Sequence, residues 1–175
     1  MEKINIYYFK SLYGELILGS YGEKLCLCDW RYRKQRESID SRIKQGLGCE
    51  YTDNDDIVLK VARRQLTEYF NHNRKVFDIP LLTVGTPFQK RVWNSLLNIP
   101  FGETASYLEL AEEVADKKAV RAIAGANGAN ALSIFIPCHR IIGSNGNLAG
   151  YAGGTKVKAK LLCLERDLFN RDLFN

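Results

Sequence analysis

Cys138 and His139 are adjacent residues whose types are suited to covalent chemistry. They lie in the segment SIFIPCHRIIG, residues 133–143, which is otherwise largely apolar. A thiolate is a strong nucleophile, and an imidazole can remove the proton that a thiol must lose. Pro137 favours an extended conformation at Ile136, so Cys138 is predicted to lie where a buried strand leaves the core. Adjacent side chains point in different directions, so their contact, direct or through a water, depends on the following turn.

A base of this kind needs a third group to orient its ring. Glu165 is the best acidic choice, because it follows the apolar face of the predicted helix KVKAKLLCLERDLF. The alternative interpretation is a core cysteine beside a hydrogen-bonded histidine with no chemical role. Arg140 and the glycine-rich segment GSNGNLAGYAGG favour chemistry, because that segment is too polar for a core. It is able to fold over a pocket, with Tyr151 as a flat wall.

The elements that position these residues fall into two groups along the chain. In the first half, INIYYFK, ELILGS and LCLCDW alternate as antiparallel strands with turns between them. Residues 31–54 are polar and predicted to form a long surface connection, partly helical. Asp53 is the predicted cap of a helix through NDDIVLKVARRQLTEYF, and VFDIPLL is predicted to be a further strand. We place a domain boundary between residues 82 and 83.

The second half is predicted to be mostly helical. Thr86 and Gln89 have capping-box spacing at the start of one helix, and Ser106 and Glu109 repeat that spacing at the next. Asp116 is predicted to cap a third helix that runs to about residue 126. The last two helices are short and joined by a tight connection, which has the size of a helix-turn-helix.

The third of these helices is unusually rich in small residues. Its small side chains are Ala119, Ala122, Ala124, Gly125, Ala126 and Gly128. Arg121 is the one long side chain in its middle. One interpretation is close packing against a neighbouring helix. The other is a helix thin enough to press against a DNA minor groove, about 6 Å wide, with arginine as a probe.

Composition sets broad limits on the function. The chain has 175 residues, a net charge of +5 and no apolar run near the roughly 18 residues of a membrane helix. Its N-terminus has no apolar signal region, so we expect a cytoplasmic protein. The five cysteines are an odd number, and with only two histidines they predict neither a disulfide framework nor a metal site. We expect no cofactor.

Together these motifs resemble one family closely. The segment IPCHRIIGSNGNLAGYAGG is similar to the active-site signature of the O6-alkylguanine-DNA alkyltransferases, also called methylated-DNA–protein-cysteine methyltransferases. The likeness covers about residues 83–165 and includes TPFQKRVWNSLLNIPFGETASYLELA and AVRAIAGANGAN. It implies an α+β fold: residues 1–82 as an RNase H-like antiparallel sheet with a helix, and residues 83–175 as a mostly helical domain with a helix-turn-helix.

The resemblance implies DNA repair by an enzyme that uses itself once. An alkyl group, such as methyl, moves irreversibly from O6 of guanine to Cys138, and whether O4 of thymine also reacts stays open. His139 is then the base, acting through a water, and Glu165 orients it. Asn130 holds the loop that carries the cysteine. Tyr107 donates a proton to the leaving guanine and presses on the DNA phosphate.

The resemblance also implies how the chain binds its partner, double-stranded DNA that contains O6-alkylguanine. The base must be flipped out of the duplex to meet a buried cysteine, and Arg121 fills the gap that it leaves. The further predicted DNA contacts are Ala119, Ala122, Ala126 and Tyr107. The predicted pocket residues are Ser133, Tyr151, Gly153 and Gly154. We expect a monomer that contacts no membrane.

Some positions depart from the family pattern, and two other functions stay open. Ser133 stands where a pocket-lining proline is common, which affects the tolerated size of the alkyl group. A reader of alkylated guanine that does not repair it would not need the thiol. A cysteine hydrolase using Cys138, His139 and Glu165 would need an oxyanion hole, for which PCHR offers no clear donors.

Overall fold

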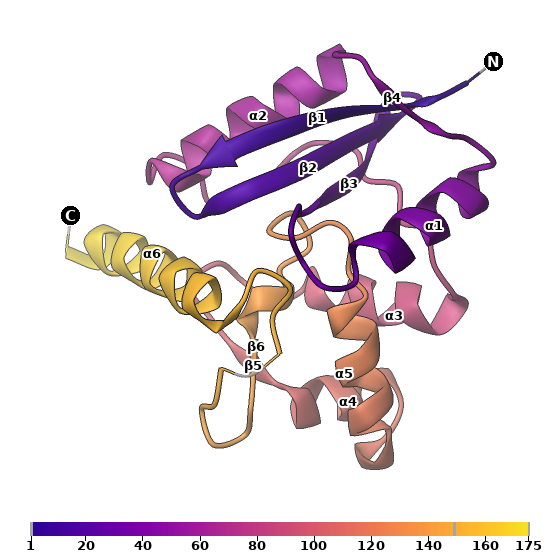
Figure 1. The fold of residues 1–175 in the computed structure, drawn as a ribbon. Coiled ribbons are helices and arrows are strands. Elements are labelled where there is room, and N and C mark those ends of the chain that lie inside the picture. Colours follow the sequence, from indigo (N-terminus) through magenta and orange to yellow (C-terminus); the bar gives the residue numbers. More distant parts are fainter. Residues whose placement is uncertain (1, 149, 175) are drawn as a thin grey trace. The chain divides into compact units, whose positions relative to one another are not determined.

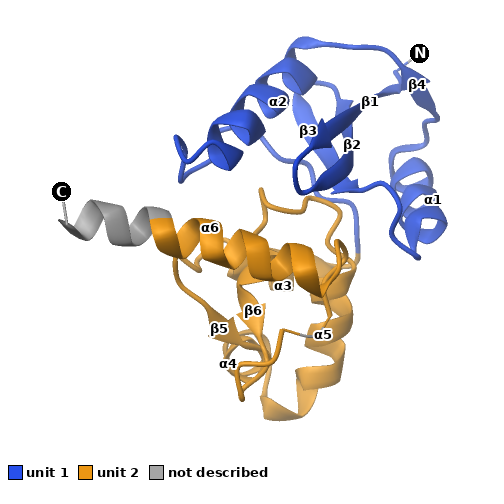
Figure 2. Cartoon of the chain, turned by 60° about the vertical axis from the view of Figure 1, so that its left-hand side comes forward, with its two compact units in different colours: residues 1–85 blue, residues 86–175 orange. Residues whose placement is uncertain are grey.

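The computed structural model describes residues 2–148 and 150–174, with side chains up to residue 167. The chain divides into two compact units, residues 1–85 and 86–175 (Figure 2). The predicted boundary between residues 82 and 83 lies just before this division. The sheet and helices confirm the predicted α+β class. Among the described residues, no helix is both long and apolar enough to span a membrane.

A four-stranded sheet forms the centre of the first unit (Figure 1). Its strands are β1 (Ile4–Ser11), β2 (Gly14–Tyr21), β3 (Lys24–Trp30) and β4 (Tyr51–Asp53), in the order β3-β2-β1-β4. The first three are antiparallel neighbours, as the alternating sequence predicted. β4 pairs with β1 in parallel, so the expectation of a purely antiparallel sheet is wrong. A parallel neighbour needs a crossover connection, and the chain between β3 and β4 supplies it.

Helices lie on both faces of this sheet (Figure 1). On one face, Ser20 hydrogen-bonds to Asp56 at the start of α2 (Ile57–Phe70). On the other face, the buried Asp29 carboxylate accepts hydrogen bonds from Arg33 and, at 2.9 Å, from Arg36 of α1 (Arg36–Leu47). Asp29 of β3 pairs with Ile17 of β2, and Ile17 lies three residues before Ser20, so alternation along β2 places Ser20 and Asp29 on opposite faces. The apolar core of the unit therefore has two layers, one under each helix.

The connection from β3 to α2 contains more regular structure than the sequence indicated. Residues 31–54 include all of α1 and β4. α1 has no side-chain cap at its start, and its buried residues are only Ile39 and Ile43, so its sequence signal is weak. Asp53 lies in β4, and the cap of α2 is Asp56, whose Oδ1 accepts a hydrogen bond from the Leu59 amide at 2.9 Å. The predicted Asp53 cap is therefore wrong.

The segment VFDIPLL also differs from the prediction. It makes a single bridge to β3, between Leu25 and Leu81, and no named strand. The Leu25 amide donates to the Pro80 carbonyl at 2.9 Å, and the Leu82 amide donates to the Leu25 carbonyl at 2.8 Å. Because proline has no amide proton, it allows only this short contact at the sheet edge.

Three helices pack together in the second unit: α3 (Pro87–Leu96), α4 (Tyr107–Val114) and α5 (Val120–Gly128). The predicted capping boxes are confirmed at both Thr86 and Ser106. Asp116 caps a short 3-10 turn, Lys117–Ala119, that leads into α5. The buried Trp93 of α3 donates its indole N–H to the Ala126 carbonyl of α5 at 2.8 Å. This bond fixes α5 against α3.

Two short elements complete the second unit. β5 (Ala105–Ser106) pairs in parallel with β6 (Ile141–Ile142). α4 begins directly after β5, and the 3-10 turn Cys138–Arg140 ends directly before β6. The pairing of β5 with β6 therefore brings the start of α4 close to this turn. The helix α6 (Thr155–Phe174) then packs on that turn. Three elements distant in sequence thus meet at Cys138–Arg140.

Candidate active site

Cys138 begins a tight 3-10 turn and is only 3% exposed. The Cys138 amide donates to the Ile136 carbonyl at 2.8 Å, and the Arg140 amide donates to the Pro137 carbonyl at 3.0 Å. The apolar run before Pro137 is buried, as the sequence predicted, but it forms a turn with an isolated bridge between Ser133 and Ile136, so the predicted strand is wrong. A thiol in such surroundings reacts slowly unless neighbouring groups favour its thiolate.

Asn130 holds the segment that leads to the cysteine. Its side-chain amide donates to the Ile136 carbonyl at 2.9 Å, and its oxygen accepts from the Leu132 amide at 3.0 Å. Between Leu132 and Ile136, the two residues that Asn130 contacts, Ile134 has φ 75°, which is unfavourable for a β-branched residue. The hydrogen bonds of Asn130 stabilise this strained loop, and the loop fixes the position of Cys138.

His139 and Arg140 both bind the carboxylate of Glu165. The distance from His139 Nε2 to Glu165 Oε1 is 2.7 Å, and Arg140 donates from Nε at 2.9 Å and from Nη2 at 3.0 Å. Burial alone raises the pKa of Glu165, but the contacts with His139 and Arg140 outweigh it and lower the pKa to about 2. The carboxylate is therefore charged at neutral pH, in a cluster that is almost completely buried.

The charged carboxylate decides which histidine nitrogen is available. A carboxylate only accepts hydrogen bonds, so His139 Nε2 carries the ring proton and donates a hydrogen bond to Glu165. Nδ1 of the neutral ring is then an acceptor. Among the described residues, no hydrogen-bond partner of this buried Nδ1 atom is found. The ring can accept a proton there, and the arrangement is that of an oriented general base.

Tyr107, Asn127 and Lys158 surround the cysteine from three different elements. Burial, followed by the nearby Cys138, raises the pKa of the Tyr107 hydroxyl, and a hydrogen bond with Asn127 lowers it. Burial lowers the pKa of the Lys158 ammonium, whereas Cys138 raises it. The Lys158 Nζ atom lies 5.8 Å from the centre of the Tyr107 ring. Tyr107 and Lys158 thus interact electrostatically with the Cys138 thiol, while Asn127 contacts the Cys138 carbonyl oxygen.

The sequence did not single out Lys158 or Asn127. Lys158 is 0% exposed, and in the described part of the chain its Nζ atom has no hydrogen-bond partner. It stands between the exposed Lys156 and Lys160 in KVKAK, so its residue type alone does not separate it from them. Its spacing of seven residues before Glu165 was the one usable signal, because that spacing puts both on one helix face.

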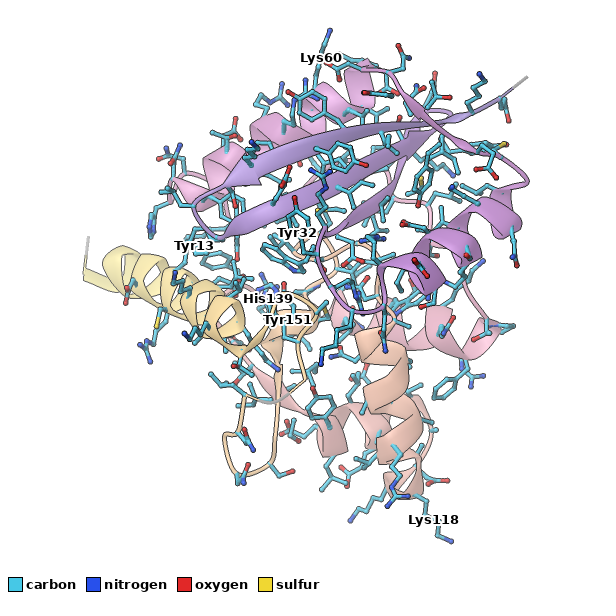
Figure 3. All side chains as sticks on the ribbon, in the orientation of Figure 1. Tyr13, Tyr32, Lys60, Lys118, His139 and Tyr151 are labelled. Atoms are coloured by element: carbon cyan, nitrogen blue, oxygen red, sulfur yellow. The ribbon has the colours of Figure 1, made fainter. Side chains whose placement is uncertain are left out.

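The predicted pocket residues lie around the same turn, at different depths. Ser133 is completely buried, and Tyr151 and Gly153 are half-buried. The rings of His139 and Tyr151 lie edge to face, with their centres 6.4 Å apart. Figure 3 labels both residues. Gly154 is exposed and has φ 89°, which favours glycine. At Gly150 a Cβ atom would approach the Tyr107 hydroxyl to 3.3 Å, so the loop after Cys138 reaches Tyr107.

The predicted DNA contacts on α5 do not all share one face. Arg121 and Ala122 are exposed, and Ala119 is half-buried. Ala126 is only 4% exposed and belongs to the core of the unit, next to Trp93. The prediction of Ala126 as a contact residue is therefore corrected: the 3.6-residue period turns it inward, five residues after Arg121. The small residues thus serve both close packing and an exposed face.

The chain is similar to known proteins in both sequence and fold. Residues 87–167 match the family model described as "6-O-methylguanine DNA methyltransferase, DNA binding domain". A constitutive methylated-DNA–protein-cysteine methyltransferase of Bacillus subtilis is 53% identical over 155 residues, which are 87% of this chain and 90% of that protein. The crystal structure of Mycobacterium tuberculosis O6-methylguanine methyltransferase aligns with a TM-score of 0.80 and 34% identity, covering 100% of both chains. That of M. tuberculosis OGT in complex with DNA has a TM-score of 0.80 and 35% identity over 94% of each.

Proposed function

The chain belongs to the methylated-DNA–protein-cysteine methyltransferase family, and we propose that Cys138 is the residue that accepts the alkyl group. Membership makes the protein a DNA-repair enzyme that transfers a methyl group from DNA to its own cysteine. The observation that carries the assignment of the residue is the arrangement around Cys138. A buried thiol stands next to a histidine whose Nδ1 is available and whose Nε2 is held by an ionised glutamate.

The proposed transfer begins with proton removal. His139 Nδ1 takes the thiol proton of Cys138 through an intervening water, while Glu165 keeps the ring in the correct tautomer. The resulting thiolate attacks the alkyl carbon on O6 of guanine. A sulfur–carbon bond forms, the carbon–oxygen bond breaks, and its electron pair stays on the purine. Tyr107 donates a proton to the departing guanine, and the proton that His139 took from the thiol returns to Tyr107 through solvent, so that overall one proton passes from the thiol to guanine.

The product explains why each molecule acts once. A thioether has no leaving group that water displaces. The Lys158 ammonium stabilises the thiolate before transfer, because Cys138 and Lys158 interact electrostatically. After transfer the sulfur is neutral, and that attraction is lost. The reaction is therefore irreversible and stoichiometric.

Access to Cys138 requires that the damaged base leave the duplex. A thiol that is 3% exposed cannot reach an atom inside stacked DNA. We propose that α4 and α5 act as a helix-turn-helix at the minor groove and that Arg121 occupies the space of the extruded nucleotide. Exposure of Arg121 and Ala122 on α5 supports this proposal. A side chain inserted between bases offsets an unstacking cost of a few kcal/mol.

The decisive experiment is intact-mass spectrometry after incubation with duplex DNA that contains O6-methylguanine. We expect a gain of one methyl group per chain, and no gain for Cys138→Ala. Cys163→Ala is the matched control, because that thiol is exposed and lies outside the site. Tight binding without a mass change would favour a damage reader. Repeated turnover of an ester or amide would favour a hydrolase.

Three further expectations belong to this proposal. Residues 86–175 carry every site residue named above and would bind double-stranded DNA with O6-alkylguanine, while residues 1–85 support them. We place the protein in the cytoplasm, because a reducing compartment keeps a reactive thiol free. We expect it to be a monomer. No group of three possible metal ligands occurs among the described His, Cys, Asp and Glu residues, and the expectation of no metal or cofactor stays a prediction.

A further inference from the structure

The outer edge of β1 is paired over only part of its length. β4 pairs with Ile4–Ile6, and no other strand in the described part of the chain lies beside the rest of this edge. The Ile4 amide donates to the Glu50 carbonyl at 3.2 Å on the β4 side. Successive residues of a strand direct their N–H and C=O groups to opposite edges, so Tyr8 and Lys10 present theirs on the same side as Ile4. The second half of β1 therefore has an open edge.

A groove of about 680 Å³ follows this open edge. α2 runs alongside β1 (Figure 1), and the Arg63 guanidinium of α2 lies 3.9 Å from the centre of the Tyr7 ring. Alternation places Tyr8 and Lys10 on the opposite face of the sheet, where the Arg31 guanidinium lies 3.9 Å from the centre of the Tyr8 ring. Residues of both faces line the groove, so it extends around the strand edge and leaves the main chain accessible.

The charges of this groove favour an acidic ligand. Its two carboxylates, Glu15 and Glu68, are each held by an arginine, at 2.8 and 2.6 Å. Its exposed cations are held less closely. Arg64 is 61% exposed, and its Nε atom lies 3.8 Å from Glu68 Oε1. Lys10 is exposed and lies opposite Glu15 in the β1–β2 pairing, on the face away from α2. The two faces of the groove thus each offer one cation.

We propose that this groove binds an extended acidic segment of another protein, which adds to the sheet as a strand beside Tyr8 and Lys10. Main-chain hydrogen bonds supply affinity in such strand addition, and side chains supply specificity. Because successive side chains of a strand point to opposite faces, two adjacent acidic residues would reach Lys10 on one face and Arg64 on the other. The groove contains no residue of the proposed transfer site, which lies in residues 86–175, so this binding is independent of methyl transfer.

Two other occupants fit the groove less well. The phosphates of a single-stranded nucleic acid only accept hydrogen bonds, so they would not satisfy the carbonyl groups of the edge, and Glu15 and Glu68 would repel them. The rings of Tyr7 and Tyr8 each carry a guanidinium on one face, which restricts stacking with bases. A second copy of β1 would offer YFKS, residues 8–11, which contains no acidic side chain.

The probe is a fluorescein-labelled threonine octapeptide with two adjacent central aspartates, because threonine favours an extended chain. Fluorescence anisotropy with the full chain gives its dissociation constant. The same peptide N-methylated throughout cannot donate main-chain hydrogen bonds, and a version with two lysines reverses the charge. We expect saturable binding of the first peptide. The N-methylated peptide should bind at least about tenfold more weakly, because each lost hydrogen bond accounts for about three- to tenfold. The lysine peptide should also bind more weakly.

Substitutions locate the binding on the chain. Tyr8→Pro removes one edge-facing donor, and proline is tolerated at such a position of an edge strand. It should bind the aspartate peptide about three- to tenfold more weakly than Tyr8→Val, which loses the same ring but keeps the donor. Lys10→Gln and Arg64→Gln should each weaken binding about two- to fivefold. Lys24→Gln, at an exposed position of β3, is the matched control and should have no effect. Thermal unfolding shows which variants are folded.

The outcomes are distinct from those that test methyl transfer. Absence of saturable binding, equal binding of the N-methylated peptide, or equal affinity of the two folded Tyr8 variants would overturn the inference. The N-methylated peptide decides the matter without a variant if Tyr8→Pro does not fold. Binding of single-stranded DNA that Lys10→Gln and Arg64→Gln weaken, without peptide binding, would overturn it in favour of nucleic acid. Dimerisation that Tyr8→Pro abolishes would overturn it in favour of a second copy. Methyl transfer should proceed at the wild-type rate in every folded variant, so these failures would leave the proposed function intact.

Discussion

Replacement of Glu165 by glutamine tests the cluster that orients His139. The amide has the shape of the carboxylate but carries one N–H₂ group in place of an acceptor. His139 Nε2 and both Arg140 atoms that contact Glu165 are donors, so in Glu165→Gln at least one donor must face another. The buried guanidinium of Arg140 also loses its counter-charge. The variant should therefore be both less stable and slower.

The pKa of Glu165 gives the size of the effect on stability. A fall from 4.5 to about 2 corresponds to roughly 3 kcal/mol, at about 1.4 kcal/mol per pKa unit. Removing one partner of a buried ion pair costs a similar amount, about 3–5 kcal/mol. We expect the free energy of unfolding to fall by about 3 kcal/mol. We expect the transfer rate to fall by up to about 10²–10⁴-fold, the range for the general base His139 that Glu165 orients.

Two assays at pH 7 measure these effects. Urea unfolding gives the loss of stability, and intact mass after mixing with O6-methylguanine DNA gives the rate under conditions where the variant stays folded. Glu112→Gln is the control, because its exposed contact with Lys117 at 3.4 Å contributes at most about 1 kcal/mol. Stability within 1 kcal/mol of wild type and a rate within threefold would refute the role of Glu165.

Three other outcomes follow from the same contacts. Because the pKa of Glu165 is lowered in the folded state, its contribution to the free energy of unfolding is complete above pH 4.5 and is lost as the pH falls toward about 2. Unfolding measured as a function of pH should show this loss in the wild-type protein and not in Glu165→Gln. Arg121→Ala should slow repair of duplex DNA at least tenfold more than reaction with free O6-benzylguanine, and equal losses would contradict the insertion of Arg121. Lys158→Met should raise stability by about 1–3 kcal/mol, because it removes a buried ammonium without hydrogen bonds among the described residues, yet slow transfer. Lys160→Met should change neither quantity, and a faster or unchanged Lys158→Met enzyme would argue against thiolate stabilisation.

The sequence predicted best where the signal is local. Both capping boxes depend on residues three positions apart, and both formed as expected. Residue types pointed to Cys138 and His139, and the place of Glu165 after the apolar face of the predicted last helix pointed to that carboxylate. The structure brings these residues together in one buried cluster. Their family roles came from the resemblance, because adjacency in sequence says nothing about the tautomer of His139.

The sequence predicted least where the environment of a residue depends on distant segments. β4 has three residues and no strong alternation, so its parallel partner β1 could not be deduced from its composition. Ala126 resembles Ala122 as a residue type, and only the rotation of α5 separates buried from exposed. The same holds for Asn127, whose neighbours Cys138 and Tyr107 come from other elements.

The hydrogen bond between Glu165 of α6 and His139 of the turn Cys138–Arg140 has a consequence for protein synthesis. Glu165 follows His139 by 26 residues, so the ribosome must release α6 before the histidine acquires its partner. Until that helix docks, Arg140 lacks its carboxylate and His139 lacks its fixed tautomer. A nascent chain therefore carries a cysteine with no oriented base. Such a delay would protect a nucleophile that acts only once from being consumed by alkylating agents before the protein has folded.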